Sequence, residues 1–190
     1  MNTRPKIITL TGAHWTWKDT LIAWLCQVID HSARVVSTTD RLPRPWEIAW
    51  EHYYYAEQVP PDEKLYAVIH FPVFNTRTGQ AWYSYWVTHE YIASLFDAHP
   101  DTTYLWHTGL PVVKKLKAQF PGKVYSIYLY ADTDVRIARL MERDAMMREQ
   151  VLDRLAHDPW DIPPGERWIF DIVIDTSEKT AEEVMREVVG

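Results

Sequence analysis

The sequence predicts an α/β fold built on a central parallel sheet. Residues 7–11 form a short apolar, β-branched run that ends at Gly12, and residues 18–30 carry apolar side chains at helical spacing. Further strands are expected at 34–37, 103–106, 124–130 and 169–175, the last three separated by segments of helical character. Because strands that alternate with helices pair in parallel, we expect one sheet with helices on its faces.

The composition indicates an ordered globular protein. The 190 residues include 47% hydrophobic and 24% charged side chains. The only cysteine, Cys26, excludes an internal disulfide and a thiolate metal site, which is typical of a cytoplasmic protein. A net charge of −6 argues against a broad nucleic-acid surface, and no apolar stretch has the roughly 20 residues that span a membrane.

The middle of the chain, at about 37–89, differs in composition from its two ends. It is rich in Pro, Tyr, Trp and charged residues with short strand-like pieces, which indicates an inserted lobe. Residues 140–157 are arginine-rich and helical. Thr176 and Ser177, followed by helical spacing from Ala181, predict a capped C-terminal helix.

The loop after the first strand stands where a phosphate-binding loop, G-x-x-x-x-G-K-[ST], would stand. Gly12 and Lys18 are in register, Asp19 takes the Ser/Thr position, and Thr20 offers a hydroxyl to Mg²⁺. In such loops backbone N–H groups surround a phosphate and the lysine reaches its oxygens. The candidate nucleotide-binding residues are Gly12, Ala13, His14, Trp15, Thr16, Trp17, Lys18, Asp19 and Thr20. The alternative is an ordinary strand-to-helix turn with Lys18 in solvent.

A second motif lies in the inserted lobe. Residues 39–47 read TDRLPRPWE and Tyr53 follows, which resembles the guanylate-kinase segment T-T-R-x-x-R-x-G-E-x-x-G-x-x-Y at identical spacing. In that family these groups hold the acceptor phosphate, which implies the same role for Arg41, Arg44 and Tyr53. Residues 81–86 fall where the family has N-G-x-Y-Y-G, so the resemblance adds Tyr85. The alternatives are exposed arginines on a Pro-rich loop and ordinary aromatic packing.

Arginines at 139–143 and at 154 extend the resemblance. Arg139, Arg143 and Arg154 match the family's R-L-x-x-R and the arginine eleven residues further on. Because phosphoryl transfer depends on positive groups around the transferred phosphoryl, the resemblance implies catalytic roles for Lys18 and these arginines. Asp175 lies where the family often contacts adenine. The alternative is a helix surface with arginines paired to neighbouring acids.

The resemblance to guanylate kinases covers nearly the whole chain and implies a P-loop kinase with an inserted acceptor-binding lobe and a helical lid. We expect a single domain over 1–190, with its core at 1–36 and 100–190, the lobe at about 37–90 and the lid at about 140–157. The implied cofactors are ATP and Mg²⁺, and the implied partner is a small phosphorylated acceptor. We expect a cytoplasmic monomer or homodimer that binds neither nucleic acid nor membrane.

The acceptor itself has two interpretations. The two acids that read guanine in the family are missing, since the chain offers residues 68–70 (VIH) and 106–108 (WHT) at those places. Their absence favours the related ribose 1,5-bisphosphate phosphokinases. The motif of Arg41 and Arg44 favours a nucleoside or deoxynucleoside monophosphate, similar to GMP or dGMP, and we prefer this interpretation.

The chain has ten tryptophans against six glycines. Alignment by the motifs places six of these tryptophans where the family has glycine: Trp15, Trp17, Trp46, Trp50, Trp82 and Trp86. Glycine serves there for a positive φ or for close approach to phosphate. We hypothesise a systematic replacement, either by engineering or by a reassigned stop codon that the source reads as glycine. With the tryptophans in place, the alternative function is a catalytically inert guanylate-kinase-like domain that binds protein partners.

Overall fold

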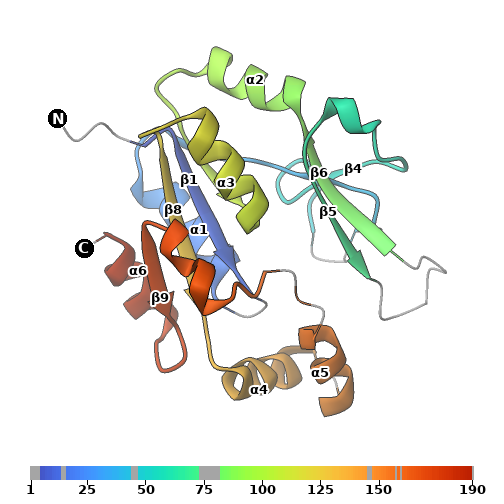
Figure 1. Ribbon diagram of the computed structural model, residues 1–190, viewed down its shortest axis with the longest axis vertical. Helices are drawn as coiled ribbons and strands as arrows, with labels where there is room; N and C mark the ends of the chain where they lie inside the picture. Colours follow the sequence, from blue (N-terminus) through green and yellow to red (C-terminus); the bar gives the residue numbers. More distant parts are fainter. Residues whose placement is uncertain are drawn as a thin grey trace. The chain divides into compact units, whose positions relative to one another are not determined.

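The computed structural model describes residues 5–13, 16–43, 47–72, 82–144, 147–156, 158 and 160–189 (Figure 1). The chain divides into two compact units, residues 1–34 with 103–190, and residues 35–102. The predicted α/β fold is confirmed, because the first unit holds a parallel sheet flanked by helices. Within the described ranges, no helix is long and apolar enough to cross a membrane.

The sheet of the first unit has five strands in the order β2-β7-β1-β8-β9. They are β1 (Ile7–Gly12), β2 (Ser32–Arg34), β7 (Thr103–His107), β8 (Val124–Tyr130) and β9 (Ile172–Asp175). β1 is central, and its Leu10 lies between His107 of β7 and Ile127 of β8. All five strands are parallel, so their carboxyl ends meet at one edge, where ligands of open α/β sheets bind.

Helices cover both faces of this sheet (Figure 1). The first unit contains α1 (Lys18–Val28), α3 (Leu110–Gln119), α4 (Thr133–Asp144), α5 (Arg148–Ala156), a 3₁₀ helix η3 (Pro164–Ile169) and α6 (Ala181–Val189). The core against α1 and α6 includes Ile127 and Leu129 of β8. Tyr128, between them, packs instead with Val113 of α3. This alternation is the period of two that a strand buried on both faces requires.

The second unit has a four-stranded sheet in the order β4-β3-β6-β5. Its elements are β3 (Thr38–Thr39), β4 (Tyr54–Tyr55), a 3₁₀ helix η1 (Asp62–Lys64), β5 (Leu65–Pro72), β6 (Trp82–Thr88) and α2 (His89–Ala98). The register places Ile69 and Thr39 opposite Tyr85, so these three residues share one face of the sheet. Residues of the same strands offset by one position belong to the other face.

Two predicted features differ from the structure. The strand predicted at 34–37 is wrong, because β2 ends at Arg34 and residues 35–37 belong to no strand. Val35 and Val36 are nevertheless buried, so their apolar type signals burial and not sheet pairing. The strand expected from 169 begins at Ile172, after η3.

The cap of the C-terminal helix also lies further along than predicted. Thr180 and Glu183 form a capping box, in which Thr180 Oγ1 accepts from Glu183 N at 3.3 Å and the Glu183 carboxylate accepts from Thr180 N at 2.8 Å. Thr176 and Ser177 instead bond to the ends of β8 and β9.

The burial of β8 yields a stability prediction. Leu129→Ala should lower the free energy of unfolding by about 3 kcal/mol, because Leu129 is fully buried and truncation leaves a cavity. Val173→Ala, on the half-exposed edge strand β9, is the control and should cost less than about 1 kcal/mol. Urea unfolding measures both, and equal losses in the two variants would contradict the assignment of this core.

Candidate nucleotide and acceptor sites

The loop after β1 keeps the glycine that the motif requires. A Cβ at Gly12 would lie 2.3 Å from the carbonyl oxygen of Leu129 and 2.7 Å from Thr16 Oγ1, so no other residue fits without movement. Thr16 is buried, and its hydroxyl donates to Ala13 O at 2.9 Å. His14 and Trp15 lie outside the described residues.

Lys18 is buried at the start of α1. Its Nζ donates to Ala13 O at 2.5 Å and lies 3.5 Å from Thr16 Oγ1, so the amine is folded into its own loop. The alternative of a solvent-exposed Lys18 is therefore wrong. Burial lowers the pKa of Lys18 to about 8, against opposing effects of Asp19 and Asp158. No side chain of the described residues caps α1, an arrangement that phosphate-binding helix starts share.

The backbone at Trp17 is left-handed. Trp17 has φ 63° and ψ 15°, and Trp50 has φ 75°. Among the described residues, His31 is the other non-glycine residue with positive φ, and histidine tolerates this region better than a bulky indole does. Two of the six tryptophans aligned with family glycines thus have the backbone conformation for which glycine is used. The geometry supports the replacement hypothesis at both positions.

The indole of Trp17 occupies the face of a predicted catalytic arginine. The guanidinium carbon of Arg139 lies 5.1 Å from the ring centroid, which is cation–π geometry. Arg139 also donates to Thr176 O at 2.7 Å, which fixes it at the carboxyl edge of the sheet. Burial lowers the pKa of Arg139. The indole Nε1 is buried without a hydrogen-bond partner among the described residues, which is a cost that a glycine would not carry.

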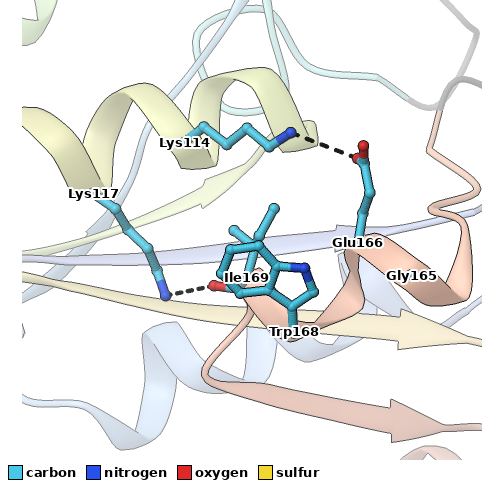
Figure 2. Close-up of a pocket in the computed structure, with 6 residues that line it drawn as sticks. All are labelled: Lys114, Lys117, Gly165, Glu166, Trp168 and Ile169. Carbon is cyan, nitrogen blue, oxygen red and sulfur yellow. Dashed lines mark hydrogen bonds and ion pairs between the residues drawn. The ribbon is translucent and has the colours of Figure 1, made fainter.

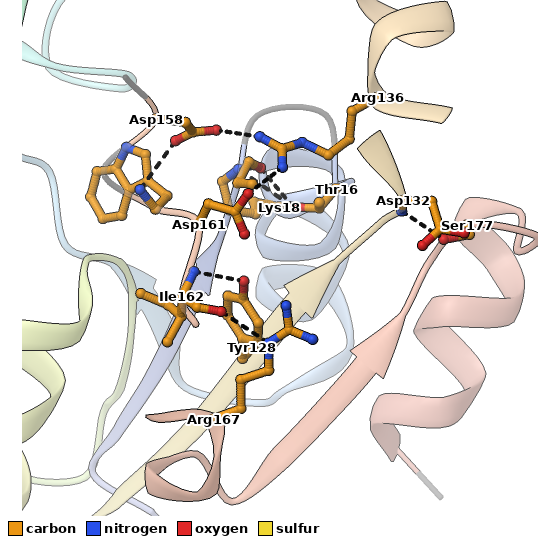
Figure 3. Close-up of polar contacts among 12 residues, drawn as sticks. Thr16, Lys18, Tyr128, Asp132, Arg136, Asp158, Asp161, Ile162, Arg167 and Ser177 are labelled. Atoms are coloured by element: carbon orange, nitrogen blue, oxygen red, sulfur yellow. Dashed lines mark hydrogen bonds and ion pairs between the residues drawn. The ribbon is translucent and has the colours of Figure 1, made fainter. Parts of the chain in front are cut away.

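An ionic cluster around the buried side chains of Arg136 and Asp158, which both act on the pKa of Lys18, escaped the sequence analysis. Arg136 of α4 donates to Asp161 at 2.6 Å and to Asp158 at 2.9 Å (Figure 3). Tyr128 fixes the segment that carries these acids, since its Oη accepts from Ile162 N at 3.0 Å. The cluster ties α4 to the segment that follows α5. In the sequence, the one sign of this cluster is the pair of acids Asp158 and Asp161 that follows Arg154.

The acceptor residues predicted in the second unit gather around Arg41. Its Nε donates to Tyr85 Oη at 2.7 Å, and its guanidinium carbon lies 5.0 Å from the ring centroid of Tyr53. Glu47 binds the same guanidinium through both carboxylate oxygens, and Tyr55 donates to Glu47 at 2.9 Å. Burial alone lowers the pKa of Arg41, but the bonds to Glu47 and Tyr85 outweigh burial and raise it. The structure thus brings three of the four predicted residues together.

Other predicted residues have different surroundings. Arg44 lies outside the described residues, as do the side chains of Arg143 and Arg154. Asp19 and Thr20 are exposed on the first turn of α1. Asp175 accepts from the backbone N and Oγ of Ser177 at 2.9 and 2.6 Å; burial raises its pKa, but these bonds outweigh burial and lower it. Within the described ranges, no three His, Cys, Asp or Glu side chains group as metal ligands.

A hollow lies between α3 and η3 of the first unit (Figure 2). Its volume is about 730 Å³, and it is lined by Lys114, Lys117, Gly165, Glu166, Trp168 and Ile169. Lys114 pairs with Glu166 and Lys117 pairs with Asp171, so both cations are partnered within the fold. The hollow contains none of the predicted site residues.

Comparison with solved structures shows a kinase-like fold. Guanylate kinase from Anaplasma phagocytophilum matches with a TM-score of 0.60 at 16% identity, over 98% of this chain and 83% of that one. An uncharacterized protein from Eubacterium ventriosum matches with a TM-score of 0.53 at 11% identity, over 96% and 95% of the two chains. A gluconokinase from Sinorhizobium meliloti 1021 has a TM-score of 0.48 at 13% identity, over 97% and 90%.

Sequence comparison adds no family assignment. No protein-family model matches the chain, and no curated protein matches it. The structural similarity to guanylate kinase therefore supports a P-loop kinase-like fold, and membership of the guanylate-kinase family stays a prediction.

The buried amine of Lys18 predicts a pH dependence of stability. The pKa of Lys18 is about 8 in the folded chain against an ordinary value of 10.5, so between these pH values the unfolded state binds more protons. The free energy of unfolding should therefore rise with pH across this window, by up to about 3 kcal/mol relative to Lys18→Met. Denaturant unfolding of both proteins from pH 7.5 to 10.5 measures the difference. Parallel curves would show that the amine is not buried.

Trp50 offers a test of the left-handed backbone that leaves core burial almost unchanged, because 74% of the residue is exposed. Trp50→Gly should be more stable than Trp50→Ala by about 1 kcal/mol, since only glycine adopts φ 75° without strain. Trp168 is 80% exposed and does not have positive φ, so it is the matched control. There the glycine variant should be no more stable than the alanine variant, and the same ranking at both sites would refute the backbone argument.

Proposed function

We propose that this chain, in the form with glycine at the six aligned tryptophan positions, is an ATP- and Mg²⁺-dependent phosphotransferase whose acceptor is a nucleoside or deoxynucleoside monophosphate similar to GMP or dGMP. One observation supports it above the others. A buried lysine amine begins the first helix at the carboxyl edge of a parallel sheet, and Arg139 is held at the same edge by the residue that follows β9. Lysine at a helix start and arginine at the same edge are the groups that phosphoryl transfer requires.

The residues divide into three roles. Lys18 and the loop from Gly12 to Thr20 would hold the ATP phosphates, and Thr20 would offer its hydroxyl to Mg²⁺. Arg139, Arg143 and Arg154 stabilise the charge on the transferred phosphoryl group. The acceptor phosphate is held by Arg41, Arg44, Tyr53 and Tyr85. An oxygen of that phosphate then bonds to the γ-phosphorus of ATP while the bond to the ADP oxygen breaks.

The proposal applies to the chain with glycine at the six aligned tryptophan positions. With Trp17 in place, the indole covers the Arg139 guanidinium and Lys18 Nζ is bonded to Ala13 O. Glycine at position 17 removes the indole and suits the left-handed backbone, so the loop residues fit an ATP phosphate in that form. The chain as written does not fit one, and an inert domain that binds protein partners is its alternative function.

A second acceptor class rests on the face of the sheet that carries Tyr85. The residue opposite Tyr85 is Ile69, whereas His70 is paired with Ser84, a residue of the opposite face, through a 2.8 Å hydrogen bond. In the guanylate-kinase family an acid recognises guanine at about this place in the chain. Here the residue on the sheet face that carries Tyr85 is the apolar Ile69. This favours an acceptor without a base, and ribose 1,5-bisphosphate is the alternative substrate.

An acceptor panel tests the proposed activity. ATP-dependent ADP release should be measured with GMP, dGMP, other monophosphates and ribose 1,5-bisphosphate. The six-glycine version should release ADP with one acceptor class, at least about a hundredfold faster than the chain as written, because one misplaced or blocked catalytic group costs on this order. The acceptor that supports turnover identifies the substrate.

The control is the six-glycine version carrying Lys18→Met, which should lose turnover with every acceptor. Equal rates for the chain as written would show that Trp17 does not block the loop. If neither protein releases ADP above the Lys18→Met control, the phosphotransferase proposal is wrong.

A further inference from the structure

The hollow between α3 and η3 has the size and the lining of a small-ligand site. Its volume of about 730 Å³ falls within the roughly 300–1,000 Å³ of small-molecule sites. The lining combines an aromatic and an aliphatic side chain, Trp168 and Ile169, with the charged side chains of Lys114, Lys117 and Glu166. Sites of this kind bind a flat ring on an aromatic face and fix its orientation through a few polar groups.

The indole of Trp168 is 80% exposed, although the chain on either side of it is anchored. Before it, the guanidinium carbon of Arg167 lies 4.3 Å from the centroid of the Tyr130 ring, in cation–π geometry. After it, Ile169 O accepts from Lys117 Nζ at 2.7 Å. The exposed indole therefore stands on a fixed backbone, and most of its surface is open to a ligand that stacks on it.

The two lysines of the hollow differ in how tightly the fold holds them (Figure 2). Lys117 Nζ also lies 2.9 Å from a carboxylate oxygen of Asp171, so its charge is neutralised within the fold. Lys114 Nζ lies 3.6 Å from Glu166 Oε2, and the two side chains are 50% and 48% exposed. An exposed pair at this distance contributes little to stability, so a bound anion can replace Glu166 as the partner of Lys114.

Positive charge is concentrated on α3, whereas the whole chain carries a net charge of −6. The ten residues of the helix include three lysines, at positions 114, 115 and 117, and no acid. Lys114 and Lys117 are three positions apart, so they lie on the same side of the helix, and both line the hollow. This helix therefore attracts an anionic ligand to a protein whose net charge repels anions.

We propose that the hollow between α3 and η3 binds a small ligand that joins a planar ring to an anionic group, with the ring on Trp168 and the anion on Lys114. A nucleoside monophosphate and an aromatic carboxylate both have this chemistry. The inference does not rest on the proposed phosphotransferase function, because the residues that line the hollow are not among those assigned to ATP or to its acceptor. It applies to the chain as written.

Calorimetric titration of the chain as written with AMP, GMP and 4-hydroxybenzoate tests the site. Adenosine and inorganic phosphate, or phenol and acetate, supply the ring and the anion separately. At least one of the three joined ligands should bind about tenfold more tightly than its separate ring or anion, because stacking and ion pairing each contribute. Whether a nucleotide or the carboxylate binds identifies the source of the ligand.

Substitutions in the hollow should change this binding in opposite directions. Trp168→Ala should weaken it about tenfold, the scale of the stacking of one base on an aromatic ring. Lys114→Gln should also weaken it, whereas Glu166→Gln should tighten it, because the competing carboxylate is lost. Two controls should change it by less than about twofold: Trp50→Ala, at another exposed tryptophan, and Lys115→Gln, at an exposed position of α3 that does not line the hollow.

Equal binding by Trp168→Ala and the parent chain, tighter binding by Lys114→Gln, or no joined ligand that binds more tightly than its separate parts would each overturn the inference. Binding that Trp168→Ala retains in full belongs to another place on the chain, such as the Arg41 cluster of the proposed acceptor site. Failure of the phosphotransferase assays leaves this test unaffected, because it measures neither ATP binding nor turnover. Thermal unfolding of each variant shows whether the fold is retained.

Discussion

The candidate nucleotide site depends on a left-handed backbone at Trp17, the residue before Lys18. The turn at position 17, with φ 63°, directs the chain from the end of β1 into α1 and lets the lysine amine reach the carbonyl of Ala13. A tryptophan there costs roughly 1–2 kcal/mol of backbone strain and buries an indole N–H that has no hydrogen-bond partner among the described residues. The same indole covers Arg139. The Trp17 side chain thus strains the left-handed backbone at its own position and also covers the guanidinium of Arg139.

In each of the two units, carboxylates neutralise a buried arginine. Arg41 is neutralised by Glu47 in one unit, and Arg136 by Asp158 and Asp161 in the other. Removing one member of such a pair leaves a buried charge, which is far costlier than the pair itself is stabilising. The pairs therefore matter for orientation more than for net stability. They hold the Tyr85 hydroxyl beside Arg41, and α4 beside the segment that carries Asp158 and Asp161.

Sequence patterns predicted the layout of the sheet better than the contacts of the site. Apolar runs located β1, β7 and β8, because strands buried on both faces are continuous in hydrophobicity. The same rule failed at 34–37, since Val35 and Val36 are buried without joining a strand. The motifs located Lys18, Arg41 and Tyr85, but they could not show that Glu47 engages Arg41 or that Arg136 pairs with Asp158. Such contacts join residues whose neighbourhood is set by tertiary packing.

ATP binding to single variants at position 17 tests the central claim most directly, because it isolates the left-handed residue from the other tryptophans. Calorimetry should compare the chain as written with Trp17→Gly and Trp17→Ala, since both variants remove the indole and only glycine suits the backbone. The account predicts no measurable binding by the chain as written, binding by Trp17→Gly, and weaker binding by Trp17→Ala. Equal affinity of all three proteins for ATP would contradict it.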